Sequence, residues 1–332
     1  MTPSGEMARQ RAESDVDAHA VAGVAAGGGA TATLAGRSGA GPAGGLTVRA
    51  ATLEEWREVA EWAAAEGWNP GHGDTDCFHA TDPDGFFIGL LDGQLVSSVS
   101  VVNYSSRYAF LGYYLAHPDH RGRGLGLATW RAAVPHAGER TIGLDAVPEQ
   151  EATYRRAGFA TAYRTTRFRG WPGRAGRGGP AAVPGGAGVS VVPVGAEHLD
   201  EVAAYDRRCF PADRGAFLAR WLTAPGHHAY VQVRDGRVAG YGAVRPCRDG
   251  YRVGPLFADT SRGAEAVFDA LMGHVGPGEV VYVDVPDPHH SARALVVSRG
   301  LEADSHTMRM YTGAVEAVRV ERGYAVTSLE LG

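Results

Sequence analysis

The segment from His117 to Ala128, HPDHRGRGLGLA, interleaves arginine with glycine between two stretches of different character. The apolar residues 108–116 before it predict a strand, and the alanine-rich residues after it predict a helix. A glycine-rich turn at a helix start exposes backbone N–H groups, and the helix dipole adds about half a unit of positive charge there. We therefore expect this turn to bind an anion, most simply a phosphate.

Six consecutive residues form the expected phosphate cradle. The amides from Gly122 to Gly126 would donate hydrogen bonds, and the arginine side chains would add charge. The dinucleotide pattern G-x-G-x-x-G is not met, because Leu127 stands where its last glycine belongs. The cradle residues are Arg121, Gly122, Arg123, Gly124, Leu125 and Gly126.

The composition excludes several other kinds of site. All 32 basic residues are arginine, so a lysine Schiff base, a pyridoxal phosphate site and a Walker A loop are all ruled out. The formal net charge of −5 offers no global attraction to nucleic acid. The three cysteines form no C-x-x-C pair, which argues against a disulfide framework or a zinc site and favours the cytoplasm. No apolar run reaches the ~20 residues of a membrane span.

Two low-complexity stretches divide the 332 residues. Residues 1–45 are rich in Ala, Gly, Ser and Thr and predict a disordered tail. Residues 169–188 are rich in Pro and Gly and predict a linker. The segments on either side of that linker, 46–168 and 189–332, are long enough to form one domain each.

These two segments repeat one pattern. Each begins with a strand and an amphipathic helix, the first starting near Thr52, and each continues with two β-rich runs around an Asp-Gly turn. The turns are Asp92-Gly93 and Asp235-Gly236, and such a pair of residues is a strong hairpin signal. Strand, helix, strand and helix follow in both. The repetition predicts two copies of one α/β fold.

With the anion turn added, the first copy resembles the GNAT superfamily of acyl-CoA-dependent N-acetyltransferases. The family pattern Arg/Gln-x-x-Gly-x-Gly/Ala is matched by residues 121–126, and its tyrosine four residues before Gly-Phe is matched by Tyr154. The duplication resembles the tandem-GNAT subgroup over residues 46–330. The resemblance implies a mixed α/β fold of two GNAT-like domains, each a mostly antiparallel twisted sheet flanked by helices.

The resemblance also implies a reaction, the direct transfer of an acetyl group from acetyl-CoA to an amine. In this family, backbone N–H groups at the end of the strand that precedes the cradle stabilise the developing negative charge, here at about Leu115 and Ala116. Tyr154 resembles the residue that protonates the departing thiolate; taken alone, its spacing also fits core packing.

The general base and the acceptor site are open between several residues. Asp145 ends the next strand on the correct side of the sheet, yet Asp284 repeats it in the second copy, where it could simply shape the turn. Asp74 and Asp76 are rival bases. The segment that holds them, with Trp68 and Asn69, lies where the family binds its acceptor. An ordinary polar loop is the alternative.

The second copy lacks the same motifs. It has no Arg-x-x-Gly-x-Gly pattern, and Val296 stands at the tyrosine position. We expect this half to buttress the first and to wall the acceptor pocket, with Tyr251, Arg245 and residues 284–290 as lining candidates or as packing residues. The paired histidines at 227–228 and 289–290 have no Cys or carboxylate at metal-ligand spacing, so no metal is expected. In the first copy, Val147 replaces a frequent family asparagine, and Gln150 is a neighbour that could serve instead.

The sequence thus predicts a cytoplasmic N-acetyltransferase, active in residues 46–168, that uses acetyl-CoA and no metal. Its acceptor is a small-molecule amine, with no nucleic acid or membrane as partner, and its oligomeric state is not indicated. Two alternatives stay open. One is a non-catalytic acyl-CoA sensor, against which Tyr154 counts, because a sensor needs no proton donor. The other is a protein or peptide N-acetyltransferase, which an open cleft would favour.

Overall fold

The structure is a computed structural model that describes residues 45–172, 183–184, 188–316 and 318–332. The tail predicted at 1–45 lies outside the described residues except for Gly45, as does most of the linker predicted at 169–188. No helix in the described ranges is long and apolar enough to cross a bilayer.

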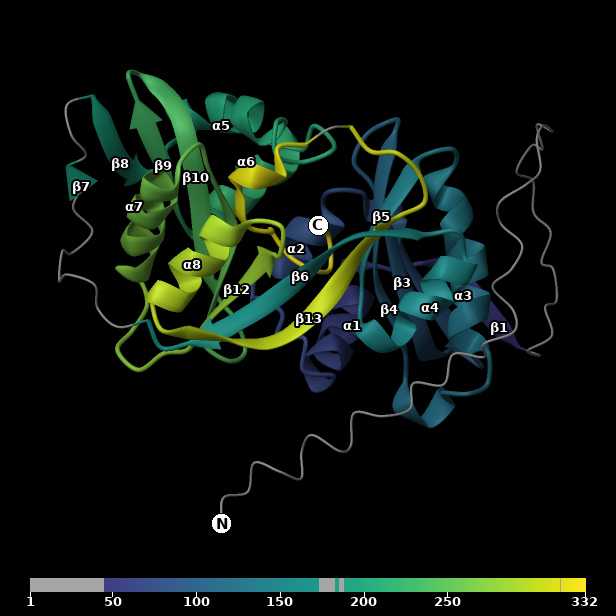
Figure 1. The fold of residues 1–332 in the computed structure, drawn as a ribbon. Helices are drawn as coiled ribbons and strands as arrows, with labels where there is room; N and C mark the ends of the chain where they lie inside the picture. Colours follow the sequence, from purple (N-terminus) through teal and green to yellow (C-terminus); the bar gives the residue numbers. More distant parts are fainter. Residues whose placement is uncertain (1–44, 173–182, 185–187, 317) are drawn as a thin grey trace, which may run out of the picture.

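Each half contains the same kinds of element in nearly the same order (Figure 1). The first half consists of β1 (Leu46–Ala50), α1 (Leu53–Ala65), α2 (Asp74–His79), β2 (Phe86–Leu91), β3 (Gln94–Asn103), β4 (Tyr108–Ala116), α3 (Leu125–Ala133), β5 (Thr141–Ala146), α4 (Glu151–Arg156) and β6 (Ala160–Gly170). The second half consists of β7 (Val183–Pro184), β8 (Val189–Pro193), α5 (Leu199–Asp206), α6 (Gly215–Thr223), β9 (His228–Arg234), β10 (Arg237–Pro246), β11 (Tyr251–Ala258), α7 (Ser261–Met272), β12 (Val281–Pro286), α8 (His290–Ser298), β13 (Leu301–Tyr311) and β14 (Gly323–Ala325).

Local sequence signals account for several of these elements. Thr52 caps α1 in a capping box, in which the Glu55 amide donates to the Thr52 hydroxyl and the Thr52 amide donates to the Glu55 carboxylate. Asp92-Gly93 turns between β2 and β3 with positive φ at both residues, 51° and 81°. Asp235-Gly236 does the same between β9 and β10, at 50° and 74°. The helix start near Thr52 and both predicted hairpins are confirmed.

The two halves are joined in one mostly antiparallel sheet, in the order β1-β2-β3-β4-β5-β13-β6-β12-β11-β10-β9-β8-β7. β13 of the second half lies between β5 and β6, while β6 of the first half lies beside β12. β6 and β13 pair antiparallel along their length, from Leu301 opposite Gly170 to Tyr311 opposite Ala160. Figure 1 shows them running side by side between the halves. Each half therefore completes its sheet with a strand from the other.

A shared core also holds the halves together. Trp56 and Phe78 from the first half pack in one buried cluster with Phe217 and Trp221 from the second. The Phe78 and Trp221 rings are stacked, with centroids 5.5 Å apart and planes 7° from parallel. The stack of Phe78 on Trp221 crosses the boundary, and burial of side chains of this size contributes on the order of 2 kcal/mol each. The second half is thus packed onto the first and is not a loosely tethered domain.

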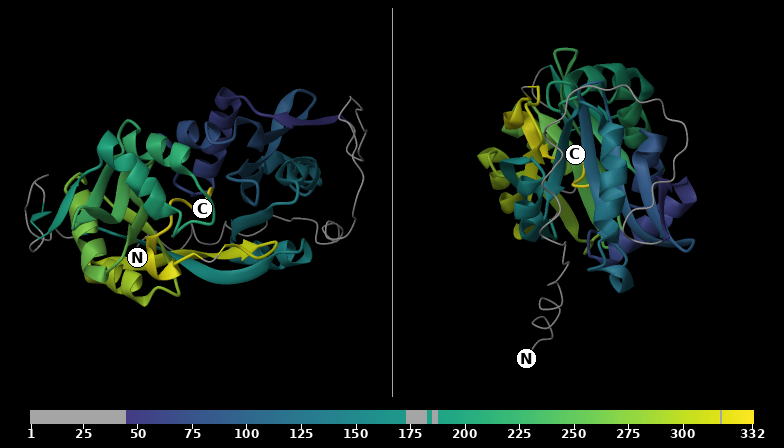
Figure 2. Two further views of the ribbon diagram at one scale, coloured as in Figure 1. Left: turned by 90° about the horizontal axis from the view of Figure 1, so that it is seen from above. Right: turned by 90° about the vertical axis from the view of Figure 1, so that its right-hand side faces the viewer.

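In each half, two parallel strands pair for only a few residues and then separate, and they do so at equivalent places. β4 pairs with β5 only from Tyr108 to Phe110, and β11 pairs with β12 only from Tyr251 to Val253. In the second half, β14 fills the opening: it pairs with β11, and the Val326 amide donates to the Asp284 carbonyl of β12 at 3.0 Å. In the first half the opening widens into a cavity. Figure 2 shows the chain ending between the two halves.

Candidate active site

A cavity of about 700 Å³ extends from the helix α3 N-terminus into the opening between β4 and β5. Its lining includes cradle residues at one end and residues of the second half at the other. Its volume is in the range typical of small-molecule sites. One continuous space therefore links the anion turn, the strand opening and the interface between the halves.

The anion turn has the backbone that its sequence predicts. Gly122 and Gly124 have φ of 72° and 73°, a region in which other residues are strained. Gly124 is the N-cap of α3 and provides no side-chain cap, so the first N–H groups of the helix are left for a ligand. Arg121 is held by Glu66 and by the Ala116 carbonyl, and Arg123 contacts His120. All predicted cradle residues except Arg123 line the cavity.

Strand β4 is distorted where it borders the cavity. Tyr113 has a φ of 49°, and the register with β3 shifts between Ser98 and Ser100. Such a bulge re-aims the backbone beyond it. Leu115 and Ala116, the predicted oxyanion-stabilising positions, follow the bulge and line the cavity.

Tyr154 lies on the short helix α4 and also lines the cavity. Its ring packs against Trp130 of α3 and Phe159, with centroid distances of 5.7 and 6.0 Å. Burial raises the pKa of the Tyr154 hydroxyl above its ordinary value of 10.0, with a smaller contribution from Tyr114. The group therefore keeps its proton at neutral pH, as a proton donor must.

Asp145 is among the cavity residues, but its carboxylate is fully engaged. Arg309 of β13 donates to both of its oxygens, at 3.0 and 2.7 Å, and the Asp145 side chain is completely buried. Burial raises the pKa of Asp145, while Arg309 opposes the rise. Because both oxygens already accept hydrogen bonds from a buried arginine, this geometry disfavours Asp145 as the base.

The predicted acceptor segment is split between two roles. Trp68 lines the cavity and lies 5.9 Å from the Tyr113 ring. Asn69 is turned away and bonds to Cys247 and Asp249 of the second half, through its Nδ2 donor and the Asp249 amide. Of the predicted acceptor residues on this segment, Trp68 alone lines the cavity.

The two aspartates of that segment also lie outside the cavity. Asp74 is buried and accepts two bonds from Arg245, at 2.6 and 3.1 Å. Burial would raise the pKa of Asp74, but the charge and hydrogen bonds of Arg245, the charge of Arg252 and the Gly71 amide together outweigh it, and the pKa lies below the usual value. Asp76 is exposed and pairs with Arg57. Asn69 and Asp74 hold the halves together, a role that the sequence gave no means to foresee.

The second half supplies cavity residues that the sequence did not single out. They are Ser305, His306, Thr307, Leu329 and Glu330, which come from β13 and from the segment after β14. None of its predicted lining candidates, which were Arg245, Tyr251 and residues 284–290, is a cavity residue. No local sequence pattern identifies the five second-half residues that do line the cavity. Strand exchange and the path of the final segment bring those five residues to it.

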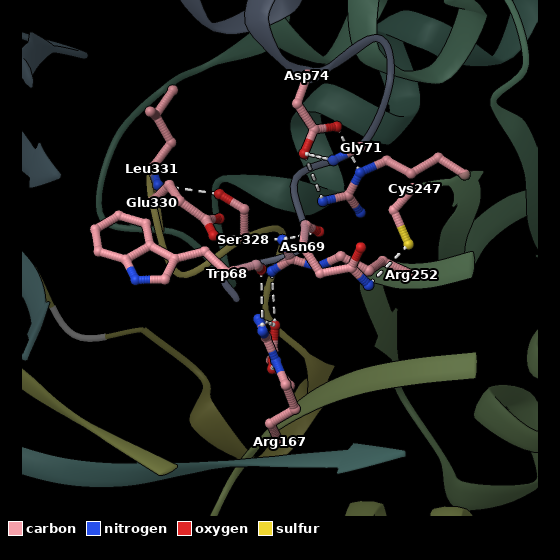
Figure 3. A network of polar contacts seen from close by, with 12 residues as sticks. Trp68, Asn69, Gly71, Asp74, Arg167, Cys247, Arg252, Ser328, Glu330 and Leu331 are labelled. Carbon is pink, nitrogen blue, oxygen red and sulfur yellow. Dashed lines mark hydrogen bonds and ion pairs between the residues drawn. The ribbon is translucent and has the colours of Figure 1, made fainter. Parts of the chain in front are cut away.

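A chain of ion pairs runs from the exchanged strands to the cavity (Figure 3). Arg167 of β6 donates to both oxygens of Asp284, at 2.7 and 2.9 Å, and Arg252 of β11 donates to Asp284 at 2.9 Å. Arg252 also donates to Glu330 at 3.3 Å. Burial would raise the pKa of Asp284, but the two arginines lower it below the usual range. Asp284 thus anchors the cavity wall.

Among the described residues, no group of three or more His, Cys, Asp or Glu side chains is arranged to hold a metal ion. His227 bonds to the Trp221 carbonyl, and His289 caps α8. Both histidine pairs thus include a residue with a local structural partner.

Comparisons with known proteins agree with this geometry. A model of the acetyltransferase (GNAT) family matches residues 52–159, and a model of an acetyltransferase (GNAT) domain matches residues 202–324. The chain is 36% identical over 286 residues to holothin acyltransferase of Pseudoalteromonas sp. (strain SANK 73390), covering 86% of this chain and 94% of that protein.

Solved structures show the same fold. A putative acetyltransferase from Pyrococcus horikoshii aligns with a TM-score of 0.73 at 21% identity, over 90% of this chain and 99% of that one. A tandem GNAT protein from the clavulanic acid biosynthesis pathway aligns with a TM-score of 0.56 at 18% identity, over 82% and 99%. The chain therefore belongs to the GNAT acetyltransferase family and is an acyl-CoA-dependent N-acyltransferase built from two GNAT domains in tandem.

Proposed function

We propose that this enzyme transfers an acetyl group from acetyl-CoA directly to the amine of a small molecule, and that it does so in the cytoplasm. The observation that carries the proposal is the cavity, which connects an uncapped helix start and two left-handed glycines to Tyr154 and to a wall from the second half. The free cysteines, Cys77, Cys209 and Cys247, suit a reducing compartment.

In this proposal the pyrophosphate of the donor rests on the amides of Gly122 to Gly126, with Arg121 and Arg123 supplying charge. The acyl chain reaches into the opening between β4 and β5. N–H groups at Leu115 and Ala116 stabilise the negative charge that develops on the carbonyl oxygen. Acyl-CoA supplies the thioester; these residues supply its position and the electrostatic field around it.

The chemical step forms one bond and breaks another. The amine nitrogen attacks the thioester carbon, the C–S bond breaks, and Tyr154 gives its proton to the departing sulfur. Burial raises the pKa of Tyr154, so the hydroxyl holds a proton at neutral pH, as a donor must.

The wall that the second half adds to the cavity supports a small molecule over a protein tail. The second half contributes Ser305 to Thr307, Leu329 and Glu330 to the lining, which narrows the room for an acceptor at that side. Trp68 offers an aromatic wall for the acceptor. Holothin acyltransferase, by its name, acts on holothin, which also favours a small acceptor.

The second half is proposed to bind no acyl-CoA. β14 occupies its opening between β11 and β12, where the first half has its cavity. One acetyl-CoA per chain is therefore expected by isothermal titration.

The test is thiol release from acetyl-CoA, with longer acyl-CoAs in parallel, across amino acids, polyamines, aminoglycosides and a short peptide. Release that requires a small amine supports the proposal. Release with the peptide alone would assign the enzyme to peptide substrates. Binding of acetyl-CoA without release with any amine would favour the sensor function instead.

A further inference from the structure

Glu330 is a buried carboxylate that the second half delivers to the cavity of the first. It follows β14 on a segment held by several bonds: the Ser328 hydroxyl accepts from the Leu331 amide, and Tyr104 of the first half donates to the Leu331 carbonyl. The residue is 5% exposed and lines the cavity. Figure 3 shows it beside Trp68, above the Arg252 side chain.

Only one of the two carboxylate oxygens of Glu330 has a hydrogen-bond partner among the described residues. Oε1 accepts from Arg252 at 3.3 Å, and Arg252 divides its donors between Glu330, Asp284 and the Asn69 carbonyl. Oε2 is buried and has no partner there. An unpaired buried carboxylate oxygen costs free energy unless a ligand satisfies it, so this atom marks a place for a hydrogen-bond donor.

The other cavity carboxylates are less suited to that donor. Arg309 holds both oxygens of Asp145, and Arg121 holds Glu66. Glu149 is exposed. Glu330 alone among these carboxylates combines burial with an unoccupied oxygen.

A neighbouring tyrosine hydroxyl cannot replace it as a base. Tyr113 is buried, and its hydroxyl also has no partner in the described part of the chain. Burial raises the pKa of Tyr113 well above its ordinary value, and the charge of Glu330 adds to the rise. Tyr113 therefore stays protonated and acts as a donor toward a bound group, whereas Glu330 acts as an acceptor.

We propose that Glu330 is a catalytic residue that binds the acceptor amine and removes its proton. This assignment rests on the proposed function. Oε2 accepts a hydrogen bond from the amine nitrogen. As the N–C bond forms and the C–S bond breaks, the proton passes from nitrogen to Oε2, and the sulfur is protonated separately by Tyr154. The substrate class that follows is a primary amine small enough to reach Glu330 past Trp68.

The experiment compares Glu330→Gln with wild type and with Glu321→Gln, which removes an exposed glutamate upstream of the same segment. Glutamine keeps the volume and an oxygen for Arg252 but cannot take a proton. We expect Glu330→Gln to lower kcat by ~10²-fold or more with the amine found active in the panel. Acetyl-CoA affinity should stay unchanged, and Glu321→Gln should match wild type in both.

The pH dependence of kcat distinguishes a general base from a residue that contributes only its negative charge. The groups that face Glu330 are Tyr113 from β4, Asp145 from β5 and Arg252 from β11. If Glu330 is the base, the acid-side fall of wild-type kcat is absent in Glu330→Gln. Glu330→Asp keeps the negative charge, but its shorter side chain holds the carboxylate oxygens farther from the amine. This variant should therefore fold normally and still have a lower kcat. A wild-type kcat in either variant would overturn the assignment and leave the proposed function intact. Acetyl-CoA binding without amine-dependent thiol release in wild type would overturn both.

Discussion

Gly112 on β4 lies directly against Glu330, so closely that a Cβ atom at position 112 would come within 3.0 Å of the Glu330 carbonyl oxygen. Gly254 on β11 has the same relationship to the carbonyl oxygens of Val326 and Thr327. Gly112 lies two residues beyond Phe110, where β4 stops pairing with β5. Gly254 lies one residue beyond Val253, where β11 stops pairing with β12. One segment, residues 326–330, therefore passes both openings, and a glycine on each side makes room for it.

Replacing Gly112 with alanine is expected to displace Glu330. The new methyl group would meet backbone, which cannot rotate away, so we expect a loss of about 1–3 kcal/mol in the free energy of unfolding. Amine-dependent kcat/KM should fall as well. Urea denaturation and thiol-release kinetics measure the two effects. The control is Gly276→Ala, whose nearest neighbour is the flexible Glu279 side chain. Wild-type stability in Gly112→Ala would contradict the prediction, because it would show that residues 326–330 shift to accept the methyl group at no cost.

Gly124→Glu is expected to abolish acetyl-CoA binding, by its bulk and by repulsion of the pyrophosphate. Any residue other than glycine is strained at a φ of 73°, so Gly124→Ala is the matched control. A Cβ at this position would have no neighbour within 4 Å, which means that alanine adds strain without a clash. Calorimetry should give a modest loss of affinity for alanine and no detectable binding for glutamate. Equal affinities in the two variants would contradict the cradle.

Tyr154→Phe is expected to lower kcat by ~10²-fold or more without changing acetyl-CoA affinity, because it removes only the proton donor. Since burial raises the pKa of Tyr154 above 10.0, wild-type kcat should not fall through its deprotonation up to about pH 9. The control is Tyr324→Phe, which loses a bond to Ser261 in the second half. A wild-type kcat in Tyr154→Phe would remove Tyr154 from the mechanism.

His227 is expected to make the interface between the halves sensitive to acid. Its Nδ1 donates to the Trp221 carbonyl at 2.8 Å, and burial lowers its pKa from 6.5 to about 4, with the Arg245 charge adding to the effect. The folded state thus disfavours the proton that the unfolded state binds. This contribution is present above pH 6.5 and is lost as pH falls toward 4, with about 2 kcal/mol lost between pH 7 and 5.

Urea denaturation of wild type and His227→Gln at pH 7 and pH 5 measures this contribution. The variant should be less stable at pH 7 and should show a smaller drop on acidification. An identical pH dependence in the two proteins would show that His227 does not titrate in this window. His290→Gln, at an exposed histidine, is the control.

The sequence by itself determined what depends on neighbours along the chain. The anion turn, the capped start of α1, the Asp-Gly hairpins and the duplication are local patterns, since backbone conformation and helix dipoles are fixed within a few residues. These patterns were enough to indicate the family. Of the site residues named from the family resemblance, five of the six cradle residues, Leu115, Ala116, Tyr154 and Trp68 line one cavity in the structure.

Only the tertiary structure decided the acceptor end of that cavity. The sequence allowed Asp145 as the base, but in the structure Arg309 on an exchanged strand bonds to it. The sequence also allowed Asn69 and Asp74 as acceptor contacts, but in the structure they bond to Asp249 and Arg245. Glu330 had no motif around it at all. Each of these outcomes depends on pairing between residues more than 160 apart, or on a segment threaded between the halves, and the free energy of such contacts comes from burial and charge compensation that no local pattern encodes.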